Sequence, residues 1–98
     1  MAARIDAHLH LSCDGEAGLR LLADLDLKLV NISVPQPDRE RWRARTNRFR
    51  SLAERHPDRF AWVAGFDLPT WDADGNLEVD YAERVIAGLE ENLTAGAV

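Results

Sequence analysis

Residues 46–69, TNRFRSLAERHPDRFAWVAGFDLP, hold the most informative pattern in this sequence. The first half continues an amphipathic helix that Asp38 can cap, and this helix must end before Pro57 because proline has no amide to continue it. Residues 60–66, which follow the proline, are nearly all apolar, as expected of a parallel strand that is covered on both faces. The stretch therefore predicts a helix over 38–56 followed by a buried strand over 60–66.

Short apolar runs and amphipathic segments alternate in the same way through the rest of the chain. They predict strands over 4–9 and 29–34 and helices over 16–25 and 79–95. Strands that alternate with helices are typical of a parallel sheet, and the last apolar residues of the chain look like the start of another strand. We therefore predict an α/β fold that is the N-terminal part of a TIM (β/α)₈ barrel, with three βα units and the start of the fourth strand. Residues 1–98 would form one incomplete domain.

The composition is that of an ordinary small globular protein, with 98 residues of which 46% are apolar. No apolar run is long enough to cross a membrane, and the first residues do not have the pattern of a secretory signal. A single cysteine, Cys13, cannot form an internal disulfide. These features predict a cytoplasmic protein without a membrane partner.

The charge is unevenly distributed, because residues 38–59 hold eight arginines against four acidic residues while the whole chain has a net charge of −5. The arginines do not lie on one helical stripe, whereas Trp42, Thr46 and Phe49 follow the spacing of a buried face. No aromatic residue lies on the arginine side of this helix for base stacking. The arginines are therefore expected to cover the outer surface of a helix, and no nucleic-acid partner is predicted.

The string IDAHLH, residues 5–10, holds the residues most suited to chemistry. His8 and His10 are two positions apart in a strand, so both imidazoles project from the same face. They lie at the carboxyl end of the first strand, and imidazole nitrogens are good ligands for zinc. We therefore predict that His8 and His10 bind a divalent metal, zinc, and that Asp6 orients an imidazole by a hydrogen bond. The alternative is two partly buried histidines that donate to backbone carbonyls.

Two imidazoles fall short of the three protein ligands of a catalytic zinc, and the sequence offers no good third ligand. His56 ends a helix and is therefore expected at the opposite end of the sheet. Asp67 follows a strand, where a loop-capping role is expected. Cys13 is expected to be a buried and unreactive thiol.

Together these segments resemble the amidohydrolase superfamily, specifically the amidohydrolase-related metal-dependent hydrolases. The resemblance rests on IDAHLH, on the strand VNISV and on the run over 46–69. In this run the matching residues are Asn47, Pro57, Asp58, Arg59, Phe60 and Asp67. The resemblance implies one or two divalent ions that activate water, with His8 and His10 as the first two ligands. The family's other ligands have no counterpart in these 98 residues.

The resemblance implies an enzyme that hydrolyses a C–N or C–O bond in a small-molecule substrate: an amide, an ester or a lactone-like bond. This chain would be inactive by itself and would need the missing part of the barrel or a homo-oligomer as its partner. Three alternatives remain: a decarboxylase of the same superfamily, a PHP-type phosphoesterase and a non-catalytic barrel fragment. The loop Ser12-Cys13-Asp14-Gly15 resembles the PHP type, but residues 31–37 lack its Thr-Asp-His.

Overall fold

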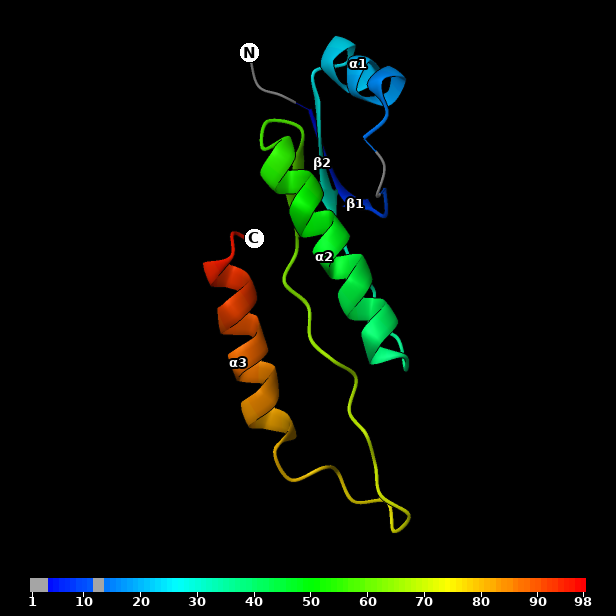
Figure 1. Ribbon diagram of the computed structural model, residues 1–98, viewed down its shortest axis with the longest axis vertical. Helices are drawn as coiled ribbons and strands as arrows, with labels where there is room; N and C mark the ends of the chain where they lie inside the picture. The colour runs from blue at the N-terminus through cyan, green and yellow to red at the C-terminus, as the bar shows by residue number, and fades with distance from the viewer. Residues whose placement is uncertain (1–3, 12–13) are drawn as a thin grey trace.

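The structure is a computed structural model that describes residues 4–11 and 14–98 (Figure 1). Its elements, in chain order, are β1 Arg4–Leu9, α1 Glu16–Asp24, β2 Leu27–Asn31, α2 Arg39–Arg55, β3 Phe60–Trp62 and α3 Tyr81–Thr94. The helices and strands expected from the sequence are confirmed in type and order. The second and third strands end earlier than predicted, at Asn31 and at Trp62.

The three strands form one parallel sheet in the order β1-β2-β3, which confirms their predicted adjacency. Leu29 of β2 lies opposite both Asp6 of β1 and Phe60 of β3. The pairing of β1 with β2 shifts register between Asp6 and Leu9. The first strand therefore has an irregularity in the same segment that contains His8.

The core lies on one face of this sheet. Leu22 of α1, Leu29 of β2, Leu52 of α2 and Phe60 of β3 form a single buried cluster. Leu29 and Phe60 are register partners in adjacent strands, so their side chains point to the same side of the sheet. Both α1 and α2 therefore pack against this face, because each contributes a leucine to the same cluster.

Local sequence specifies both ends of α2. The Asp38 carboxylate accepts the backbone N–H of Arg41 at 3.0 Å, which satisfies one of the free amides at the start of the helix. The helix ends at Arg55, two residues before Pro57. Its buried residues are Trp42, Thr46, Phe49 and Leu52. These residues lie three or four positions apart, so one stripe of the helix is buried and most of the arginines remain at the surface, as predicted.

The prediction that this chain forms the N-terminal part of a TIM (β/α)₈ barrel is wrong. The sheet is open, with three strands in the described residues, and α3 buries none of its residues. Ile86 and Leu93 of α3 remain 58% and 54% exposed. Because α3 does not cover the sheet, the chain forms fewer than three βα units. Val98 makes backbone hydrogen bonds with Trp62 and Ala64, but no fourth strand is present in the described part of the chain.

The path of the chain after β3 explains this difference. Residues 63–80 run away from the sheet in an extended course, turn back, and lead into α3 beside α2 (Figure 1). The radius of gyration is 15.9 Å, whereas a compact domain of 100 residues has about 13 Å. The long excursion places α3 away from the strands, so its apolar side chains cannot complete a layer over them.

The packing of Leu52 provides a test of this core. Leu52 is 0% exposed, so we expect Leu52→Ala to lower the free energy of unfolding by about 2–5 kcal/mol. Leu21 of α1 is 57% exposed, and Leu21→Ala is the matched control, with an expected loss of roughly 0.5 kcal/mol or less. Urea unfolding followed by far-UV circular dichroism measures both values. Equal losses in the two variants would contradict the burial described here.

Candidate functional site

The two predicted metal ligands lie close together at the carboxyl end of β1. His8 is inside the strand and His10 follows its last residue. Their ring centroids are 5.6 Å apart, the rings are nearly perpendicular at 83°, and both residues are exposed. Two imidazoles at this separation form a pair that is open to solvent.

The backbone carbonyl of Ile32, the residue that follows β2, holds the ring of His10. The Nδ1 atom of His10 lies 2.5 Å from the carbonyl oxygen of Ile32. A carbonyl oxygen can only accept, so Nδ1 carries the proton and the lone pair of the neutral imidazole is on Nε2. This is the arrangement commonly found for a histidine that binds a metal through Nε2, because the second nitrogen is fixed by a hydrogen bond.

Asp6 has a different contact from the one expected. Its Oδ1 atom accepts the backbone N–H of His8 at 3.1 Å. Among the described residues, Asp6 has no hydrogen bond to an imidazole. Its carboxylate therefore constrains the backbone of β1 beside His8 rather than the ring itself.

The described residues contain no group of three His, Cys, Asp or Glu side chains that could hold a metal ion. Cys13 lies outside these residues. The donor atoms of His8 and His10 suit zinc in type, but they supply two ligands where a catalytic zinc needs three. His8 and His10 therefore suit zinc as two ligands of a set that has at least one more.

His56, the remaining histidine, is engaged elsewhere. It follows the last residue of α2, and its Nε2 atom is 3.1 Å from Oδ2 of Asp14. The hydrogen bond with His56, together with the charge of Arg55, lowers the pKa of Asp14 below its ordinary value. The contact ties the residues just before α1 to the end of α2, so His56 has a structural role.

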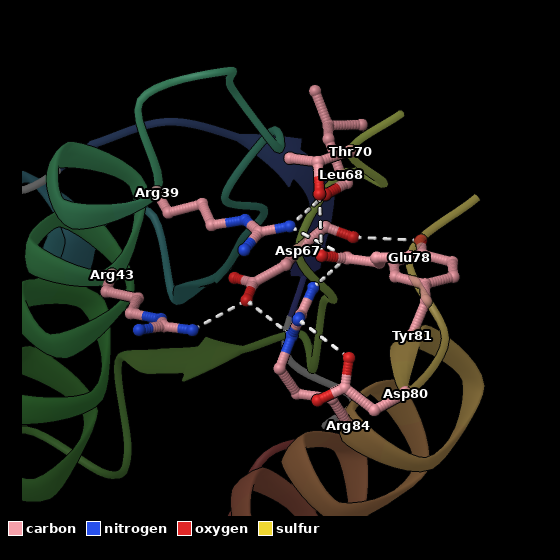
Figure 2. A network of polar contacts seen from close by, with 9 residues as sticks. All are labelled: Arg39, Arg43, Asp67, Leu68, Thr70, Glu78, Asp80, Tyr81 and Arg84. Atoms are coloured by element: carbon pink, nitrogen blue, oxygen red, sulfur yellow. Dashed lines mark hydrogen bonds and ion pairs between the residues drawn. The ribbon is translucent and has the colours of Figure 1, made fainter. Parts of the chain in front are cut away.

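Asp67 lies at the centre of a polar network between α2 and α3 (Figure 2). Its side chain is 8% exposed. The Oδ2 atom accepts a hydrogen bond from Nη2 of Arg43 at 2.6 Å and lies 3.6 Å from Nε of Arg84. The backbone oxygen of Asp67 also accepts the hydroxyl of Tyr81 at 3.0 Å. Asp67 is therefore an ion-paired buried residue rather than a simple loop cap.

Glu78 forms the other half of this network. It receives hydrogen bonds from Arg84, from Thr70 Oγ1 at 2.6 Å and from Arg39 Nη2 at 2.9 Å. These bonds, with that from Arg84 the strongest, lower the pKa of Glu78 to about 2. Arg39 belongs to α2 and Arg84 to α3, so one carboxylate joins the two helices through charged hydrogen bonds.

This network was not predicted from the sequence. Its members come from α2, from the segment after β3 and from α3, and no local motif connects them. The available signal was the excess of arginine over residues 38–59 beside an acidic remainder of the chain. That imbalance indicates ion pairs in general, but only the folded chain shows which carboxylates the arginines reach.

A cavity of about 470 Å³ lies beside the network, between α2 and α3. Arg43, Asp67 and Arg84 line its polar side, and Trp42 and Phe66 contribute apolar surface. This volume is within the range of small-molecule sites. The cavity and the histidine pair are the two candidate sites of the described chain.

Comparison of the chain with models of protein families, with curated proteins and with solved structures gives no match. Over the residues that the structure describes, no helix has the length and the apolar character needed to cross a membrane.

The low pKa of Glu78 predicts how stability depends on pH. The pKa is about 2 in the folded chain against an ordinary value of 4.5. A lowered folded-state pKa stabilises the folded chain above pH 4.5, and this stabilisation is lost as the pH falls toward 2. We expect Glu78→Gln to make the free energy of unfolding fall less between these two pH values. Chemical unfolding at several pH values measures the slope.

Glu90 of α3 provides the control for this experiment. It is exposed and takes part in none of the ion pairs of this network. We expect Glu90→Gln to leave the pH dependence as in the original chain. A Glu78→Gln variant with an unchanged slope would show that this carboxylate does not link the two helices.

Proposed function

We propose that this chain is part of a metal-dependent hydrolase of the amidohydrolase-related type, and that His8 and His10 are two ligands of its zinc ion. The observation that carries the proposal is the pairing of the two rings, with centroids 5.6 Å apart. The hydrogen bond between His10 Nδ1 and Ile32 supports it, because it leaves the lone pair on Nε2. The resemblance of IDAHLH to the metal-binding strand of these hydrolases adds further support.

The proposed reaction is hydrolysis of a C–N or C–O bond in an amide, an ester or a lactone-like small molecule. A bound zinc ion supplies Lewis acidity and lowers the pKa of a water molecule to about 7. The contribution of this chain is to present two imidazoles from β1. The Ile32 carbonyl fixes the orientation of one of them, and the Asp6 carboxylate constrains the backbone that carries the other.

The proposal requires a third protein ligand from outside the described residues, because these residues provide two. A bound zinc ion with two imidazole ligands would be held weakly and without the geometry that activates water. We therefore propose that the 98-residue chain binds zinc but does not catalyse hydrolysis by itself. We also place this activity in the cytoplasm, a proposal supported by the single cysteine, which cannot form an internal disulfide.

Zinc titration calorimetry tests the role of the two histidines. We expect the original chain to bind zinc and the His8→Ala/His10→Ala variant to bind it at least tenfold more weakly, a change of about 1.4 kcal/mol. His56→Gln is the matched control because it removes the third histidine, which is paired with Asp14. Far-UV circular dichroism verifies that each variant is folded. Equal zinc affinity in the original chain and the double variant would contradict the proposed ligands.

Hydrolysis assays with zinc present test the need for a third ligand. A panel of one ester, one lactone and one amide should give no product above the rate of zinc in buffer. Turnover by the 98-residue chain that disappears in the double variant would show that these residues form a complete site. It would therefore overturn the requirement for a ligand from elsewhere.

A further inference from the structure

The cavity between α2 and α3 has the features of a small-molecule site that is separate from the histidine pair. Its volume is about 470 Å³, within the roughly 300–1,000 Å³ of such sites. Side chains from α2 and α3 form its walls, and residues 65–67, which follow β3, form a third side. Its lining combines apolar surface with a few convergent charged groups, as binding sites for small polar molecules do.

Asp67 has an oxygen atom that the chain leaves without a donor. Its side chain is 8% exposed, and Oδ2 pairs with Arg43. The other oxygen, Oδ1, is buried and accepts no hydrogen bond from any described residue. A buried carboxylate oxygen is poorly stabilised without a donor. A ligand with an N–H group in this cavity would supply one.

Arg43 can donate a hydrogen bond to an oxygen atom of the same ligand. Its side chain is 57% exposed, and one of its nitrogens, Nη2, donates to Asp67. A guanidinium has five N–H donors, so Arg43 retains donors for a ligand oxygen next to Asp67. Arg84 Nε is also buried without a hydrogen bond among the described residues, 3.6 Å from Asp67 Oδ2. Figure 2 shows the guanidinium groups of Arg43 and Arg84 beside the carboxylate of Asp67, and all three residues line the cavity.

The charges that line the cavity are balanced. Two guanidinium groups, of Arg43 and Arg84, stand against two carboxylates, of Asp67 and Glu91. An anionic ligand would compete with these carboxylates, and a cationic ligand would compete with the arginines. Balanced charge with an adjacent donor and acceptor favours a neutral group that has both functions.

We propose that this cavity binds small molecules that carry a neutral carboxamide. The amide N–H donates to Oδ1 of Asp67, and the amide oxygen accepts an N–H of Arg43. The apolar part of the ligand packs against Trp42, Phe66 and Val85, which line the same cavity. This site does not depend on the proposed metal ligands, because none of its lining residues is His8, His10 or Asp6.

Three probes with the same ring and different charges test the proposal. Benzamide is neutral, benzoate is anionic and benzamidine is cationic. We expect benzamide to shift the backbone amide NMR signals of Gly65, Asp67 and Gly88 and to bind at least fivefold more tightly than the other two probes. The absence of benzamide binding would overturn the proposal, and tighter binding of benzoate or benzamidine would overturn its choice of a carboxamide.

A substitution that fills the cavity tests whether benzamide binds there, and it leaves Asp67 unchanged. Gly88 of α3 lines the cavity, and a Cβ atom there would meet no other atom within 4 Å. Gly88→Leu should therefore fold, since leucine is also a better helix former than glycine. We expect it to weaken benzamide binding at least tenfold.

Gly18→Leu is the matched control, because Gly18 lies in α1, is equally unobstructed and does not line the cavity. Circular dichroism verifies that both variants are folded, and zinc binding should be the same in both as in the original chain. Unchanged benzamide affinity in Gly88→Leu would show that the probe binds elsewhere. That outcome would overturn this site and leave the metal proposal unaffected.

Discussion

The burial of Leu52 between α2 and the sheet is the contact on which the rest of this structure depends. Leu52 is fully buried and joins Leu22, Leu29 and Phe60, so one cluster contains residues from α1, β2, α2 and β3. Burial of apolar surface is the main favourable term in folding, and these residues supply much of it here. The cluster holds β2 and β3 side by side. Parallel pairing with β2 then brings the carboxyl end of β1 to that of β2, where His10 contacts Ile32.

The attachment of α3 rests on a different kind of interaction. None of its residues is buried, and its link to α2 runs through Glu78, Asp67 and the arginines that face them. Ion pairs are directional and depend on pH, whereas apolar packing does not depend on pH in this way. Polar contacts therefore set the position of α3 and of the cavity: these ion pairs and the backbone hydrogen bonds of Val98 with Trp62 and Ala64. Apolar packing sets the sheet.

The two candidate sites follow from this division. The histidine pair belongs to the packed sheet, and a neighbouring strand orients one of its rings. The cavity belongs to the charged junction between α2 and α3, where Asp67 is buried with one oxygen that lacks a donor. The histidine pair is exposed, and the hydrogen bond to Ile32 fixes one of its rings. The cavity instead has a buried carboxylate among its lining residues.

The local features of this protein could be predicted from its amino-acid sequence. The spacing of apolar residues, the cap at Asp38 and the stop at Pro57 specify helices and strands within a few residues. The i, i+2 spacing identified His8 and His10 as a candidate pair. Only the folded chain shows that α3 does not cover the sheet, and this excludes the predicted barrel arrangement. Only the folded chain shows that Asp6 contacts a backbone amide and that Arg43, Asp67, Glu78 and Arg84 meet. Helical periodicity shows that a helix has an apolar face but not what that face contacts, and contacts between distant residues form only when the whole chain has folded.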